Sequence, residues 1–409
     1  MKNNIVILLL AILFTACELS EDPKLNINKE LTSKNAELIV AENNKFAFEF
    51  FKKVNGFDTA TNFMVSPVSL SLALGMAYNG AEGDTKAAFD EVLDYPATLT
   101  EVNEFNKNLI DKLSSSEDGS VMEIANSMWI HDGFPVKEEF ISLNKEYYQA
   151  EVANLDFSDP GSVDVINNWV SNKTHEKIPT IISDISNDMR LFLINALYFN
   201  AAWMYEFNKD YTEKGTFIKD NGNELEVDMM TMTENLSFYQ NDLFSSVILP
   251  YEKEKFSMVI LLPNTGKTTG DVIEAMDNTT WKTWMESYDT TDVSLNLPKF
   301  KLAYKNKLND ELIDMGLGIA FSGSADFSGI SDIALKIAYV LQKTFIDVNE
   351  EGTEAAAVTI IGFENTSLPV GNLPELFIVN RPFVYAIREN VTGSICFIGK
   401  VGAPEYEEE

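Results

Sequence analysis

Two histidines, His131 and His175, are the bases that any serine or cysteine nucleophile in this chain would need. Neither has a serine or cysteine turn beside it, although the members of a catalytic triad meet only in the fold. The sixty-three acidic residues could supply a catalytic carboxylate pair, but no spacing singles one out. We expect both histidines at the surface, and a hydrolase that uses either of them stays a minor hypothesis.

Motifs for metals and phosphates are missing as well. The sequence contains no CxxC pair, no HExxH motif and no glycine-rich loop ahead of a helix. Its net charge of −32 would repel phosphate backbones and anionic lipid surfaces. We therefore expect no cofactor, no metal ion and no nucleic-acid partner.

The N-terminus resembles a bacterial lipoprotein signal. Lys2 precedes an apolar run over residues 5–14, which is too short to span a bilayer, and Cys17 follows two small residues. Cleavage would remove residues 1–16 and leave Cys17 to carry the lipid, with residues 17–35 as a polar tether. We expect an exported protein, anchored to the outer membrane by this lipid alone and exposed at the cell surface; an extracellular, secreted protein is the alternative. Acidic residues after the cysteine resemble an outer-surface export signal: Glu18, Glu21 and Asp22.

The rest of the chain is predicted to form one α+β domain over residues 36–404, followed by an acidic tail at 405–409. Hydrophobic residues make up 45% of the chain, and no repeat or linker divides it. Helical spacing marks the first half, in Phe46, Ala47, Phe50 and Phe51, in Leu70, Leu74 and Ala77, and in Ile166, Trp169 and Val170. Strand-forming runs mark the second half, at residues 247–250, 257–262, 293–297, 335–348, 376–379 and 395–401. Helices early and strands late favour large, mainly antiparallel sheets with helices packed on them.

One stretch near the C-terminus, VNEEGTEAAAVT at residues 348–359, fits neither a core strand nor a surface loop. As a strand, it would carry one uncharged face, composed of Thr353, Ala355, Ala357, Thr359, Ile361 and Phe363. Both Glu354 and Glu364 fall on the opposite face. The small residues suggest a strand that must enter a tight space, and Gly352 would supply a backbone swivel before it. Residues 366–374 are turn-rich and predict an exposed loop.

This stretch resembles the reactive-loop hinge of the serpins, the serine protease inhibitors. The match is nearly letter for letter over Glu350, Glu351, Gly352, Thr353, Glu354, Ala355, Ala356 and Ala357. Further serpin-like motifs occur in the expected order, at residues 62–70, 80–85, 195–199, 227–230, 249–251, 297–300, 325–330 and 380–383. Each motif alone is weak, whereas the ordered series is specific.

The resemblance implies a serpin fold with an exposed reactive-centre loop over about residues 350–376. It also implies a mechanism in which a target endopeptidase, serine or possibly cysteine type, cuts the loop and forms an acyl-enzyme. The cut loop then enters the main sheet as a new strand and traps the enzyme covalently. Non-inhibitory relatives usually carry bulky, charged or proline residues in the hinge, and this chain carries none there. We expect a monomeric inhibitor; the alternative is a non-inhibitory surface lipoprotein of the same fold that binds a ligand or partner.

The family's customary spacing, counted from Glu350, places the reactive bond between Thr366 and Ser367. The loop is longer than in familiar members, so cleavage after Asn365 or Ser367 stays open. Phe363 would suit a chymotrypsin-like enzyme but would leave a shorter inserted strand. A small uncharged threonine favours elastase-like or subtilisin-like targets.

The resemblance also implies a sheet-opening region, which would comprise Ser66, Ser69, Asn195, Trp203, Gln342 and Lys299. Gln342 stands where the family often has histidine, so its hydrogen bonds to Ser66, Ser69 or Asn195 would differ in detail while remaining feasible. Lys299 is expected beside Glu350, in an ion pair worth no more than about 1 kcal/mol if exposed.

Overall fold

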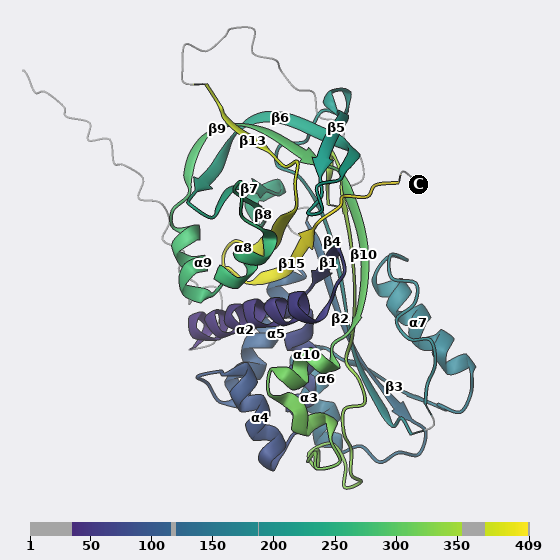
Figure 1. Cartoon of the computed structure of the whole chain (residues 1–409). Coiled ribbons are helices and arrows are strands. Elements are labelled where there is room, and N and C mark those ends of the chain that lie inside the picture. Colours follow the sequence, from purple (N-terminus) through teal and green to yellow (C-terminus); the bar gives the residue numbers. More distant parts are fainter. Residues whose placement is uncertain (1–34, 116–119, 187, 354–372, 408–409) are drawn as a thin grey trace, which may run out of the picture.

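The computed structural model describes residues 35–115, 120–186, 188–353 and 373–407 (Figure 1). The predicted signal segment, Cys17 and loop residues 354–372 lie outside them. In this part of the chain no helix is both long and apolar enough to cross a membrane.

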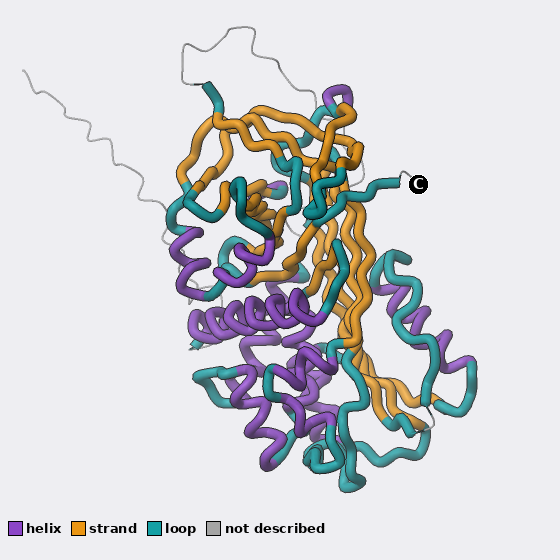
Figure 2. Tube along the Cα trace, in the orientation of Figure 1, coloured by secondary structure: helices purple, strands orange, loops and turns teal. Residues whose placement is uncertain are grey.

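A six-stranded sheet runs through the centre of the molecule (Figures 1 and 2). Its order is β10 (Phe300–Lys307), β11 (Leu341–Val348), β12 (Gly352–Thr353), β4 (Leu191–Ala202), β2 (Val121–His131) and β3 (Glu151–Leu155). All neighbours are antiparallel except β2 and β3. The long central strand β4, LFLINALYFNAA, is hydrophobic at nearly every position, which suits a sheet covered on both faces.

A nine-stranded sheet lies beyond the upper end of the first in Figure 1. Its strands are β1 (Asn62–Val65), β15 (Ile395–Val401), β14 (Phe383–Glu389), β8 (Phe256–Pro263), β7 (Phe244–Pro250), β6 (Glu224–Gln240), β9 (Asp289–Pro298) and β13 (Glu375–Ile378), with β5 (Glu213–Ile218) paired to β6. Strands β14 and β15 of this sheet form an antiparallel hairpin, and most of their residues are buried. Only β9 and β13 are parallel, so both sheets are mainly antiparallel, as predicted.

Helices cover both sheets, with most of them on one face of the six-stranded sheet (Figure 1). These are α2 (Ala36–Phe57), α3 (Pro67–Tyr78), α4 (Gly83–Leu93), α5 (Leu99–Leu113), α6 (Glu138–Tyr148) and α10 (Asn309–Asp314). On the opposite face lies α7 (Gly161–Lys173), while α8 (Thr269–Ala275) and α9 (Asn278–Met285) lie beside the nine-stranded sheet.

Helix α3 lies in the core and contacts both β4 and β15. It begins sharply because the Ser66 side chain accepts a hydrogen bond from the Ser69 N–H, and Pro67 occupies the first turn, where no N–H is needed. Nearly all its residues are buried, so a polar side chain on it must find a partner inside the protein. The three predicted helices are α2, α3 and α7, and all three are confirmed.

The strand prediction is wrong over residues 335–340. That segment makes its hydrogen bonds outside the sheet: Val340 N–H donates to Asn309 Oδ1 and its carbonyl accepts from Leu308, each at 2.9 Å. Ile337 N–H likewise donates to the Ala320 carbonyl. The division into helical and strand halves is also too simple, since β2 and β4 belong to the first half of the chain.

Candidate functional site: the gap between β4 and β11

The two central strands of the six-stranded sheet meet only through the two residues of β12. Gly352 is paired with Ala202, and Thr353 is paired with both Ala201 and Val348. Below Thr353, no ladder pair joins β4 directly to β11 within the described residues. We call the boundary between residues 191–200 of β4 and residues 341–347 of β11, along which no strand pairing joins the two, the sheet gap. The predicted loop hinge therefore begins exactly where this gap opens.

Position 352, at the upper end of the sheet gap, requires glycine because there is no space for a side chain. A Cβ atom there would lie 2.2 Å from the Ala201 carbonyl oxygen and 2.8 Å from the Ala202 Cα. Both are backbone atoms, so no side-chain movement would relieve the clash. Gly352 is not among the glycines with positive φ, so close packing and not a left-handed backbone requires glycine in this structure; the expected backbone swivel stays a prediction.

Thr353 is already inside the protein. Its side chain is buried, and its hydroxyl lies 2.7 Å from the Tyr251 hydroxyl. Trp203 stacks on Tyr251 with ring centroids 4.5 Å apart, and its indole N–H donates to the Asn349 carbonyl at 2.9 Å. Tyr251 was part of the serpin-like motif at 249–251, but nothing in the sequence indicated its contact with Thr353.

Backbone hydrogen bonds fix the turn between β11 and β12. Trp203 N–H donates to the Glu351 carbonyl and Phe207 N–H to the Glu350 carbonyl, both at 2.9 Å. Asn349 closes the turn, since its side-chain oxygen accepts from the Glu351 N–H at 3.0 Å. Trp203 thus lies beside the hinge and contacts it through both its backbone and its ring, while its role in sheet opening stays a prediction.

Glu350 and Lys299 form a buried ion pair at 3.1 Å, with 6% and 8% of their side chains exposed. Burial by itself would raise the pKa of the Glu350 carboxyl, but hydrogen bonds from its own backbone and from Thr212, with the Lys299 charge, hold that pKa below its usual value. The expected contact between the two residues is confirmed, and because the pair is buried the value of about 1 kcal/mol for an exposed pair does not apply. Removing one partner of a buried pair costs about 3–5 kcal/mol, well above the surface value.

Gln342 joins β11 to the start of α3. Its side-chain oxygen accepts from the Ser66 N–H at 3.0 Å, and its amide nitrogen donates to the Ser66 carbonyl at 2.8 Å. The Ser66 hydroxyl in turn donates to the Cys396 carbonyl on β15 at 2.8 Å. The expected Gln342–Ser66 contact is confirmed, and it uses the donor and the acceptor of one amide group.

Asn195 takes a different partner from the one considered in the sequence. Its side-chain nitrogen donates to Asn126 Oδ1 on β2 at 2.8 Å, rather than bonding to Gln342. The Asn195 Oδ1 atom is buried and has no hydrogen-bond partner within the described residues. The Ser69 N–H donates to the hydroxyl of Ser66, the N-cap residue of α3. The side chains of Ser69, Asn195 and Gln342 line one cavity.

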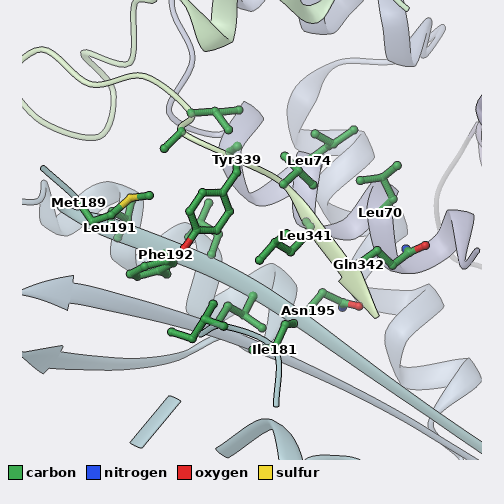
Figure 3. A pocket seen from close by; sticks show the side chains of 18 of the residues that line it. Leu70, Leu74, Ile181, Met189, Leu191, Phe192, Asn195, Tyr339, Leu341 and Gln342 are labelled. Atoms are coloured by element: carbon green, nitrogen blue, oxygen red, sulfur yellow. The ribbon is translucent and has the colours of Figure 1, made fainter. Parts of the chain in front are cut away.

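This cavity occupies the lower end of the sheet gap and has a volume of about 150 Å³ (Figure 3). Its apolar lining comes from α3, from the first half of β4, from the non-strand segment 335–340 with the start of β11, and from Ile181 and Ile182; it includes Leu70, Leu74, Leu191, Leu193 and Leu341. Figure 3 shows Asn195 and Gln342 on opposite strands at one side of it. An apolar space of this size holds a group about as large as benzene.

In the described part of the chain, neither histidine forms a hydrogen bond with a serine, threonine or cysteine side chain. His131 ends β2 and is partly buried rather than exposed as expected; its Nδ1 accepts from the Phe157 N–H at 3.2 Å. His175 is exposed, as predicted, with Nε2 3.2 Å from the Glu123 carboxylate. No group of three potential metal ligands occurs in the described ranges. The positions Glu354, Ala355, Ala356, Ala357, Thr366, Ser367 and Cys17 lie outside them, and their roles stay predictions.

Comparison with known proteins agrees with this architecture. The family model "Serpin (serine protease inhibitor)" matches residues 41–404. An uncharacterised serpin-like protein of Methanosarcina mazei is 38% identical over 91% of this chain and 88% of its own. The native crystal structure of the thermophilic serpin tengpin superposes with a TM-score of 0.82, at 33% identity, over 89% of this chain and 94% of its own. Human thyroxine-binding globulin, solved as a hormone complex, gives a TM-score of 0.81 at 28% identity, over 91% of this chain and all of its own.

The fold and these matches define the class: the chain belongs to the serpin family. Members of that family are mostly protease inhibitors and not catalytic enzymes.

Proposed function

We propose that this protein inhibits serine endopeptidases by inserting its cleaved reactive loop into the sheet gap. The observation that carries the proposal is the position of β12. Thr353 is already paired on both sides, with Ala201 and Val348, and the gap continues directly beyond it. A strand that extends from Thr353 would complete the ladder between β4 and β11.

The register of β12 sets where each later residue would lie. Continued along β4, it brings residues 354–363 opposite residues 200–191, which is the full remaining length of that strand. Thr359 would lie opposite Asn195 on one side and Gln342 on the other, if the β11 register is continued in the same way. Its hydroxyl could donate to the Asn195 Oδ1 atom that now has no partner.

The uncharged face predicted from the sequence fits the core side of the gap. Thr353 points to buried Tyr251, so alternate residues after it would point the same way. Ile361 and Phe363 would then lie beside Leu193 and Leu191, at the apolar cavity. Added ladder hydrogen bonds and this burial give a driving force on the order of 10 kcal/mol.

The test is incubation with pancreatic or neutrophil elastase, with Thr353→Arg as the matched variant. The parent should form a covalent complex that resists SDS, with a mass near the sum of the two proteins. The variant should be cut as a substrate, because a buried arginine beside Tyr251 costs several kcal/mol and blocks docking of the strand. If Thr353→Arg forms the complex as efficiently as the parent, insertion is not the mechanism.

The same experiment identifies the reactive bond, which we propose lies between Thr366 and Ser367. Mass spectrometry of the peptide released on complex formation should give a fragment that begins at Ser367. A fragment beginning at Thr366, at Leu368 or at any other residue would contradict this assignment while leaving the inhibitory mechanism in place. The preference for elastase-like or subtilisin-like enzymes should appear as faster complex formation than with trypsin.

A second candidate function is ligand binding without inhibition. It is favoured by the likeness to thyroxine-binding globulin and by the cavity in the sheet gap. A protein of this kind would be cleaved by elastase, or left intact, without forming a complex.

We further propose that the protein is exported and held at the outer membrane by a lipid on Cys17. Support comes from the N-terminal sequence alone. Labelled palmitate should be incorporated into the parent and not into Cys17→Ser. Labelling of both proteins, or of neither, would contradict the anchor.

A further inference from the structure

The residues after β15 return to the upper end of the six-stranded sheet. Asn62 Oδ1 accepts from the N–H groups of Gly402 and Ala403, at 2.8 and 2.9 Å. Lys301 N–H on β10 then donates to the Glu405 carbonyl at 2.7 Å. The chain as far as Glu405 and its neighbour Tyr406 therefore lies beside this sheet (Figure 1).

Tyr406 covers the cation that binds the loop hinge. The Lys299 ammonium nitrogen lies 4.2 Å from the centroid of the Tyr406 ring, within the range of a cation–π contact, and the Lys301 nitrogen lies at 5.6 Å. Lys299 pairs with Glu350 at 3.1 Å, and Lys301 pairs with Asp347 at 3.2 Å. One aromatic ring thus lies over both ion pairs that tie the end of β11 to β10.

These two ion pairs sit just above the part of the sheet that must widen. Asp347 is nearly the last residue of β11, and Glu350 is in the turn that leads to β12. For a strand to enter the gap, β11 must move away from β4 while this turn is carried with it. Water that reaches the pairs weakens them, since an ion pair loses strength as its surroundings become more polar. A ring that keeps water out therefore strengthens the attachment of the turn.

We propose that Tyr406 is a positioning residue for the loop hinge, which covers the Lys299–Glu350 and Lys301–Asp347 pairs and so slows opening of the sheet gap before the loop is cut. This inference rests on the proposed insertion mechanism. Burial, with the nearby Asp347 carboxylate, raises the pKa of the Tyr406 phenol, so the ring stays neutral over the physiological range.

The test measures how fast the uncut protein takes up a synthetic peptide of residues 354–366, followed by native mass spectrometry. Tyr406→Ala should take up the peptide about fivefold faster than the parent, the factor expected for loss of one cation–π contact. A chain that ends at Glu405 lacks the ring by another route and should match Tyr406→Ala. Tyr406→Phe keeps the ring over both lysines but loses the phenol's hydrogen bonds with Asp347 and Asn349, so its rate should stay closer to that of the parent than to that of Tyr406→Ala. Glu405→Ala, which alters an exposed neighbour and leaves the backbone hydrogen bond, should behave as the parent.

Salt supplies a readout that loss of tail packing alone would not move. Raising NaCl to about 1 M should speed uptake further in Tyr406→Ala, because its ion pairs are now open to screening, and should change the parent little. Equal rates in Tyr406→Ala and Glu405→Ala would overturn the inference. So would a Tyr406→Phe variant as fast as Tyr406→Ala. A parent that takes up no peptide and gains no heat resistance when its loop is nicked would instead contradict the proposed function.

Discussion

The upper and lower ends of the sheet gap are built in opposite ways. At the upper end, Gly352 fits against the Ala201 backbone without room for one further carbon, and the Thr353 hydroxyl is paired with Tyr251. At the lower end there is a cavity of about 150 Å³, and Asn195 has a buried oxygen with no partner in the described residues. The upper end is complete, whereas the lower end lacks the atoms that would fill it.

This difference shows that the lower end of the sheet gap is the place where the intact protein lacks stabilising contacts. Protein interiors are normally packed as densely as organic crystals, and atoms that line a void lose attractive contacts. A buried polar atom without a partner adds a further cost of about 1–3 kcal/mol. In the proposed mechanism, a strand that entered from the upper end would correct both defects; the hinge would guide this strand, and the lower end would supply the gain in stability.

The largest expected effect on inhibition comes from adding a carbon atom at the upper end of the sheet gap, where no space remains for it. In Gly352→Ala the added carbon would meet the Ala201 carbonyl oxygen at 2.2 Å, so β12 cannot keep its place between β4 and β11. We expect at least about a tenfold loss in the rate of complex formation with elastase, which corresponds to about 1.4 kcal/mol. Burst titration with active-site-counted enzyme measures this rate.

Gly323→Ala is the matched control for that substitution, since nothing lies within 4 Å of the added carbon and the backbone there is not left-handed. It should inhibit as the parent does. If Gly352→Ala also inhibits at the parental rate, close fit at the upper end is not required for the mechanism.

A second prediction concerns the ion pair beside the hinge and its dependence on pH. Glu350→Gln leaves Lys299 buried without its partner, so unfolding should become easier by about 3 kcal/mol at pH 7. The folded pKa of Glu350 lies below the ordinary 4.5, so its contribution is complete above that pH and is lost as the pH falls through the folded pKa. The difference between parent and variant should therefore shrink in urea melts below about pH 4.5.

Glu351→Gln is the control for the ion pair, because its partner Lys209 is 64% exposed. Such a surface pair contributes about 1 kcal/mol or less. A pH-independent difference between Glu350→Gln and the parent would show that the carboxylate charge is not what holds the hinge.

Sequence reasoning located the hinge well because its evidence is local. The glycine, the small residues and the uncharged alternate face all lie within one short segment, and their order is specific to the family. The partners of this segment could not be found in that way: Tyr251 and Thr212 are more than 100 residues from it in the chain. The burial of Lys299 depends on Tyr406, a residue that composition assigned to an acidic tail.

The fold shows the same division. Helices α2 and α3 were predictable from their periodicity. Residues 335–340 were misassigned as a strand from their β-prone composition, because their backbone forms hydrogen bonds to Asn309 and Ala320 outside the sheet. The sheet gap lies between two strands that are about 140 residues apart in the chain, so no local sequence pattern could predict it.

A third prediction concerns filling the cavity at the lower end of the sheet gap with a side chain from α3. Ala73 on α3 lines the cavity, and Ala73→Leu would place three further carbon atoms in it. Filling a cavity commonly stabilises by about 0.5–2 kcal/mol, so the intact protein should melt at a higher temperature. The rise in melting temperature on nicking the loop should become smaller, because the void that the strand would fill is already occupied. An unchanged rise would show that the cavity does not drive insertion.

The smallest effect, and the most local, is expected at Thr359. If this residue lies opposite Asn195 after insertion, Thr359→Val removes the donor for the Asn195 Oδ1 atom and leaves the shape of the strand unchanged. The nicked form should lose about 1 kcal/mol of stability, the usual net contribution of a hydrogen bond, while the intact form keeps its own. Thr359→Ser retains the hydroxyl and should retain the stability of the nicked form. Equal loss in both variants would mean that the register of β12 does not continue to the lower end of the gap, and the effect of Ala73→Leu would then need another explanation than competition with Ile361 and Phe363.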